Sequence, residues 1–74
     1  MAIFTFDNRL PKTVTVAVEP WAQVVQLDPQ SRISIDYDEP AEFDVTLEED
    51  GSVVIGVSTS RLRITAPGFD ETFG

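Results

Sequence analysis

Apolar residues recur at every second position along most of this chain, and this spacing limits the fold more than any other feature. In residues 13–18, Val14, Val16 and Val18 alternate with two threonines and an alanine. Successive side chains of a β-strand point to opposite faces, so this spacing indicates strands with one buried and one exposed face. The alternation predicts strands over residues 2–7, 14–19, 33–37, 42–48, 53–58 and 61–65.

Two segments follow the pattern less clearly. In residues 22–28, Val24 and Val25 are adjacent, so they would point to opposite faces, and neither a strand period nor a helix period is favoured. Residues 69–74 carry Phe69 and Phe73. We interpret them as a final short strand or a flap over one end of the core, with a frayed terminus as the alternative.

Turn residues separate these runs. All five prolines lie near the end of a predicted strand, and proline cannot donate to the hydrogen-bond ladder of a sheet. The stretch Glu49-Asp50-Gly51 between two alternating runs predicts a hairpin. We therefore expect a single all-β domain over residues 1–74. It should be a small antiparallel β-sandwich or barrel of six to eight short strands, connected mostly as a meander.

The chain has 74 residues and contains neither cysteine nor histidine. A domain of this size buries only about 60% of the surface that its unfolded chain exposes, so its stability is marginal. The composition provides no disulfide, no thiolate or imidazole metal ligand and no imidazole general base. Subunit association or a well-patterned core must supply the stability, and we expect a homo-oligomer.

Charge narrows the classes of function. Thirteen acidic residues against five basic ones give a formal net charge of −8, which argues against direct binding to nucleic acid or to an anionic membrane. No apolar run approaches the ~20 residues of a membrane-spanning helix. The N-terminus lacks the pattern of a secretory signal, so we expect a cytoplasmic protein. Solvated carboxylates are poor general bases, so we predict that the protein is not an enzyme.

Eight acidic residues, with no basic residue among them, lie between Ile33 and Ser60. We expect residues 33–37 to pair with residues 42–48 as a hairpin, with Phe43, Val45 and Leu47 facing the core. The acidic side chains would then share one outward face, where facing like charges cost about 0.2–1 kcal/mol each. This face either keeps the protein soluble or docks a basic partner. The residues predicted to bind the partner there are Asp36, Asp38, Glu42, Asp44 and Glu48.

Two other interpretations of these carboxylates stay open. Their regular spacing along a strand is compatible with mimicry of nucleic-acid phosphates. Calcium takes six to eight oxygen ligands, but neither residues 36–39 nor residues 48–51 match the spacing of a calcium loop. We predict no metal site and no cofactor.

Trp21 follows a strand that ends at Glu19-Pro20. Its indole N–H requires a partner and tryptophan is seldom fully buried, so Trp21 is a candidate core cap, interface anchor or ligand platform. We include it among the partner-binding residues. Arg61 and Arg63 point outward in the expected meander, two strands from the acidic hairpin. They either meet the acidic face of a second copy or only cover apolar surface.

The run Phe6-Asp7-Asn8, followed by Val14 to Glu19-Pro20-Trp21, resembles small uncharacterised bacterial β proteins of similar size. The resemblance covers the first half of the chain, and Glu-Pro-Trp is its distinctive part. Those proteins tend to have a glycine in the following turn, where this chain has Asp28-Pro29-Gln30-Ser31. The resemblance implies an all-β fold and brings no activity, cofactor or binding residue with it.

Taken together, the sequence predicts a non-enzymatic acidic β module that binds a protein partner, of the immunity, inhibitor or adaptor type. A small-ligand or carbohydrate binder with a pocket near Trp21 is the first alternative. A self-assembling structural subunit is the second.

Overall fold

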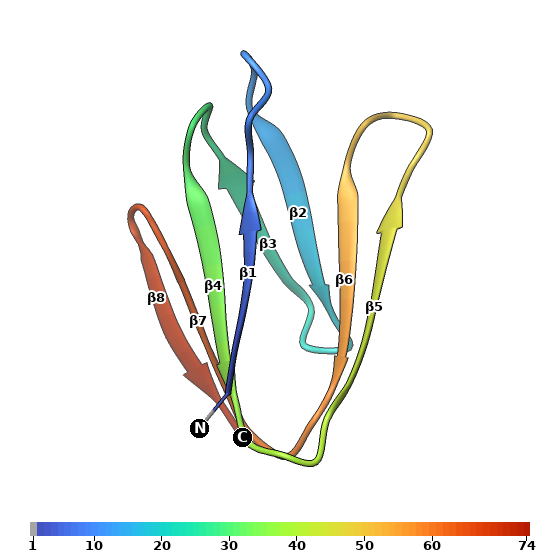
Figure 1. Ribbon diagram of the computed structural model, residues 1–74, viewed down its shortest axis with the longest axis vertical. Helices are drawn as coiled ribbons and strands as arrows, with labels where there is room; N and C mark the ends of the chain where they lie inside the picture. Colours follow the sequence, from blue (N-terminus) through green and yellow to red (C-terminus); the bar gives the residue numbers. More distant parts are fainter. Residues whose placement is uncertain (1) are drawn as a thin grey trace.

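The computed structural model describes residues 2–74, which form eight β-strands and no helix (Figure 1). None of the described residues therefore belongs to a helix that could cross a membrane. The strands are β1 (Ala2–Asp7), β2 (Val14–Glu19), β3 (Gln23–Leu27), β4 (Arg32–Tyr37), β5 (Glu42–Leu47), β6 (Val53–Ser58), β7 (Leu62–Ala66) and β8 (Phe69–Phe73).

The strands form two sheets of four. One sheet has the order β1-β4-β7-β8, with all neighbours antiparallel. The other has the order β3-β2-β6-β5, in which β2 and β6 are parallel and the other two pairs are antiparallel. We call them the β1 sheet and the β5 sheet. They enclose one apolar core, so the predicted small all-β sandwich is confirmed.

The connections between strands differ from the expected meander. Hairpins join β2 to β3, β5 to β6 and β7 to β8, whereas the other four connections carry the chain from one sheet to the other. Pro11, Pro29 and Pro40 lie in three of these crossings, where the missing N–H ends a ladder. Turn residues mark where a strand ends, but they do not specify which strand the next one pairs with.

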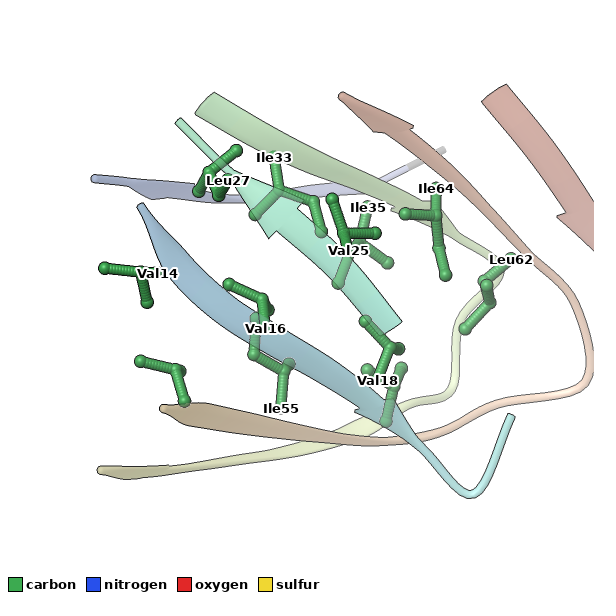
Figure 2. Close-up of a cluster of buried hydrophobic side chains, with 12 residues drawn as sticks. Val14, Val16, Val18, Val25, Leu27, Ile33, Ile35, Ile55, Leu62 and Ile64 are labelled. Carbon is green, nitrogen blue, oxygen red and sulfur yellow. The ribbon is translucent and has the colours of Figure 1, made fainter. Parts of the chain in front are cut away.

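The core lies between the two sheets and consists of aliphatic side chains from five of the strands (Figure 2). The alternation predicted this inward set well, since Val16, Val18, Ile33 and Ile35 have no exposed surface. The twelve buried apolar residues are Val14, Val16, Val18, Val25, Leu27, Ile33, Ile35, Val53, Ile55, Val57, Leu62 and Ile64.

The two ambiguous segments are both strands. In β3, Val25 is buried while its neighbour Val24 is 56% exposed, so the segment does alternate, with an apolar residue on its outer face. The C-terminal segment forms β8, whose Phe69 and Phe73 pack partly buried against the core. Pairing with β7 holds this end of the chain in place.

Among residues 2–74, Asn8 is the one buried polar residue, and no pattern in the sequence pointed to it. Its side-chain amide donates to the carbonyl oxygens of Lys12, Leu27 and Asp28 at 2.8, 2.9 and 3.2 Å, and its Oδ1 accepts the N–H of Leu10 at 3.0 Å. One side chain therefore ties the β1–β2 loop to the end of β3.

Aromatic side chains connect the two sheets. Phe43 of β5 stacks on Phe4 of β1 with ring centroids 4.8 Å apart, and it meets Tyr37 of β4 edge-on at 4.7 Å. Phe43 thus connects β5 to the opposite sheet.

Candidate functional site

The acidic hairpin predicted from the sequence does not exist, because β4 and β5 belong to different sheets. The four residues Asp38–Ala41 cross from one sheet to the other instead of forming a hairpin turn. Asp36 and Asp38 are therefore not on the face that carries Glu42 and Asp44. The predicted site separates into three parts. The β5 group consists of Glu42, Asp44 and Glu48, the β4 group consists of Asp36 and Asp38, and Trp21 stands apart from both.

Asp36 lies on the outer face of the β1 sheet, where its neighbours across the strands are Ile3 and Arg63. The expected separation of Arg63 from the acidic residues is thus wrong. The Arg63 guanidinium donates two hydrogen bonds to Asp70, at 2.8 and 2.7 Å. These bonds and the Asp70 charge raise the pKa of Arg63, with a smaller contribution from Asp36. The same bonds and the Arg63 charge lower the pKa of Asp70.

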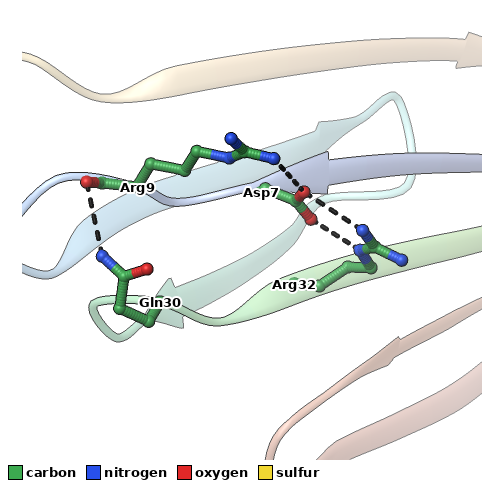
Figure 3. Close-up of polar contacts among 4 residues, drawn as sticks. All are labelled: Asp7, Arg9, Gln30 and Arg32. Carbon is green, nitrogen blue, oxygen red and sulfur yellow. Dashed lines mark hydrogen bonds and ion pairs between the residues drawn. The ribbon is translucent and has the colours of Figure 1, made fainter.

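A second ion pair joins β1 and β4 on the same face (Figure 3). Arg32 donates to both carboxylate oxygens of Asp7, and Arg9 lies 3.7 Å from the same carboxylate. The hydrogen bond from Arg32 is the main cause that lowers the pKa of Asp7. Arg9, Arg32 and Arg63 are therefore all engaged with acids of their own chain.

Asp38 lies in the crossing between β4 and β5 and is held by its backbone. Its N–H donates to the carbonyl of Arg61, and its own carbonyl accepts the hydroxyl of Thr59 at 2.6 Å. These backbone contacts of Asp38 fix the path of the loop.

Trp21 is half-buried and caps the core. Its indole Nε1 donates to the carbonyl of Val57 at 3.0 Å, and its ring centroid lies 6.2 Å from that of Phe73. Both contacts serve the fold, so the indole N–H already has its partner within the chain.

The β5 group keeps the arrangement that the sequence predicted. Glu42 and Asp44 point outward from β5, and Glu48 follows the end of the strand, and all three are exposed. The strands of the β5 sheet carry Glu19, Glu42 and Asp44 and no basic residue. The outer face of this sheet is therefore acidic, whereas the outer face of the β1 sheet has arginines paired with aspartates.

A shallow depression of about 510 Å³ lies on this acidic face, above Gly56. Glu19, Glu42 and Asp44 are among the residues that line it. A Cβ atom at Gly56 would collide with the Asp44 carboxylate, so the absence of a side chain at Gly56 leaves room for that carboxylate over β6. The depression presents carboxylates to any group that approaches the outer face of β5.

The inner face of β5 is open, which the sequence did not predict. Val45 and Leu47 lie opposite the buried Ile55 and Val53 of β6, so they point toward the core side of the sheet. They are nevertheless 50% and 75% exposed. The expectation that they belong to the core is wrong, because β5 contacts the opposite sheet through Phe43 at its beginning and its second half is not covered.

The backbone of β5 has an unpaired edge, since β5 is the last strand of its sheet (Figure 1). The Glu48 N–H donates to the carbonyl of Ser52 at 2.8 Å, which shows which alternate residues of β5 form hydrogen bonds with β6. Because antiparallel ladders alternate, residues 42, 44 and 46 bond to β6. The N–H and C=O groups of Phe43, Val45 and Leu47 point away from the sheet.

Among the described residues 2–74, no group of three or more acidic side chains is arranged to hold a metal ion. No family model, curated protein or solved structure matches this chain.

Proposed function

We propose that this protein is a non-enzymatic binding module that docks another protein on strand β5, in the manner of an immunity protein, an inhibitor or an adaptor. The observation that carries the proposal is the exposure of Val45 and Leu47 on the core side of the sheet. Exposed apolar side chains that lie together beside an unpaired strand edge are typical of interaction sites.

Charge supports a basic partner. Glu42, Asp44 and Glu48 flank the apolar residues of β5, and the sheet to which they belong has no basic residue in its strands. Complementary potential speeds the association of two proteins and selects among partners. A basic protein is therefore favoured over an acidic or neutral one.

The alternatives from the sequence have less support. A ligand pocket near Trp21 would use an indole whose N–H already bonds to Val57. Self-assembly through Arg63 would compete with its bonds to Asp70, and a homo-oligomer has to form against a net charge of −8 on each copy. A cytoplasmic location and the absence of direct nucleic-acid binding stay predictions.

Site-specific photocrosslinking in the native host tests the proposal. A photoreactive phenylalanine analogue at Leu47 should crosslink to a different protein, whereas the same group at Thr5, on the outer face of β1, should not. The Thr5 variant controls for crosslinking to abundant host proteins through random collision. Equal crosslinking at both positions, or crosslinking at Leu47 to small molecules only, would contradict the proposal.

A further inference from the structure

Four strands form the edges of the two sheets: β1, β8, β3 and β5. β8 directs the charged Glu71 toward the core side, which discourages pairing with another chain. The inward residues Val25 and Leu27 of β3 are buried, and Phe4 and Phe6 of β1 pack partly buried against the core. Within residues 2–74, β5 is thus the edge strand that leaves two apolar side chains on its core side, Val45 and Leu47, at least half exposed.

We propose that β5 accepts an extended segment of a partner protein as an additional antiparallel strand, and that this segment alternates apolar and basic residues. The inference rests on the proposed function and specifies the partner's chemistry. The unpaired N–H and C=O groups of Phe43, Val45 and Leu47 provide the hydrogen-bonding edge. An added strand satisfies them and extends the β5 sheet to five strands.

The side chains of β5 define what the added strand contains. Residues directly opposite one another in a sheet share a face. The partner's residues opposite Phe43, Val45 and Leu47 therefore lie on the core side, where apolar side chains cover the exposed surface. Those opposite Glu42 and Asp44 lie on the acidic outer face beside the depression over Gly56, where Lys or Arg finds carboxylates.

A second copy of this chain is a poor occupant of the same edge. A symmetric antiparallel β5–β5 pair that keeps apolar residues on the core side has a few registers, and each one places acids opposite acids. Centred on Val45 it pairs Glu42 with Glu48. Centred on Asp44 it pairs Asp44 with itself, and centred on Thr46 it pairs Asp44 with Glu48. Facing like charges destabilise a strand pair.

Three blocked synthetic peptides of equal length test this inference by NMR titration of the intact protein. The first is Lys-Val-Lys-Val-Lys-Val-Lys. The second has the same residues in the order Lys-Lys-Lys-Lys-Val-Val-Val, and the third replaces each lysine of the first with glutamate. We expect the first to perturb the β5 amide signals and to bind at least about tenfold more tightly than the other two.

N-methylation separates strand addition from simple charge attraction. In antiparallel pairing, the valines opposite Phe43, Val45 and Leu47 direct their N–H groups toward β5, whereas the lysines direct theirs to solvent. A peptide N-methylated on its valines should lose binding at least about tenfold. Its isomer, N-methylated on three of the four lysines, has the same charge and composition and should bind like the parent peptide.

A pair of protein variants tests the apolar face. Val45→Thr with Leu47→Thr keeps charge and strand propensity but removes apolar surface, so it should weaken binding of the first peptide several-fold. Ile3→Thr changes a site on the outer face of β1 whose exposure lies between those of Val45 and Leu47. It is the matched control and should leave binding unchanged.

Several outcomes overturn the inference. Equal binding of the alternating and block peptides, or of the two N-methylated isomers, shows attraction by charge alone and leaves protein docking on β5 intact. A dimer at neutral pH with protected β5 edge amides makes a second copy the occupant. Absence of peptide binding overturns strand addition, whereas the crosslinking at Leu47 decides the proposed function separately.

Discussion

At the scale of single residues, hydrogen bonds from the side chains of Asn8 and Trp21 to backbone carbonyls help to hold this small sandwich together. Asn8 joins a loop to a strand end through bonds to three carbonyls and one N–H. Trp21 closes one end of the core with a ring contact and a hydrogen bond. The paired arginines lie on the surface and are screened by water, so they contribute less.

Asn8→Ala removes the side chain that bonds to three backbone carbonyls and one backbone N–H. The bond to the carbonyl of Leu27 is buried, and the other three are partly buried. Groups left buried without a partner are costly, so we expect the free energy of unfolding to fall by about 3 kcal/mol. Urea denaturation measures the change. The substitution Thr5→Ala on the outer face of β1 is the control, and an Asn8→Ala variant as stable as the control would refute this role.

Trp21→Phe keeps a ring beside Phe73 but removes the donor to the carbonyl of Val57. We expect a loss of about 1 kcal/mol, the usual net contribution of one hydrogen bond. Thermal unfolding followed by circular dichroism measures it. If Trp21 served only as an exposed binding platform, the substitution would leave the melting temperature unchanged.

Acid should weaken the ion pairs of the β1 sheet. The pKa values of Asp7 and Asp70 lie below 3.8 in the folded protein, chiefly because Arg32 and Arg63 hydrogen-bond to them. A carboxylate with a lowered folded pKa contributes stability above its unfolded pKa and loses it as the pH falls. Below about pH 3.8 we therefore expect stability to decline, and Asp70→Asn to make that decline shallower in urea unfolding at stepped pH. If stability falls with pH as steeply in Asp70→Asn as in the parent protein, the contribution of the Asp70–Arg63 ion pair is contradicted.

At the scale of elements, β5 differs from β6 although both strands alternate in sequence. The same face of each points to the core side, yet Ile55 has no exposed surface and Leu47 is 75% exposed. Alternation tells which side chains share a face, and it predicted the fold class and the inward set of β2, β4, β6 and β7. It does not tell whether a second sheet covers that face. For the same reason it could not show that β4 and β5 lie in different sheets.

Substitutions on these two strands should differ in cost. Leu47→Thr changes an exposed residue, so we expect the free energy of unfolding to stay within about 0.5 kcal/mol of the parent. Ile55→Ala leaves a cavity in the core and should cost about 2–5 kcal/mol. Chemical denaturation of both variants measures the difference. A loss above about 1 kcal/mol for Leu47→Thr would mean that another part of the protein covers β5.

At the scale of the whole molecule, charge is divided between the two sheets. The net charge is −8, and the arginine–aspartate pairs neutralise part of the β1 sheet while the β5 sheet keeps its carboxylates unopposed. We expect repulsion between these carboxylates to oppose the pairing of two copies at neutral pH. The exposed apolar residues of β5 remain accessible to the basic partner that we propose.

Lowering the pH should change the oligomeric state of the protein. Although the small size of the chain favoured an oligomer, the charge of the β5 sheet leads us to expect a monomer of 8.2 kDa in sedimentation velocity at pH 7. Near the isoelectric point of about 4.1 the carboxylates are partly protonated, and self-association through β5 should increase. The double variant Val45→Thr with Leu47→Thr should suppress that association. A stable dimer at pH 7 that the double variant does not affect contradicts both expectations.

Amide hydrogen exchange of the isolated protein, followed residue by residue by NMR, tests the open edge of β5 most directly. The amides of Asp44 and Thr46 donate to β6 and should exchange slowly, whereas those of Phe43, Val45 and Leu47 point away from the sheet and should exchange quickly. A fast–slow alternation along β5 is the predicted result. Uniform protection of all five amides would show that the edge is already occupied and would contradict an open β5.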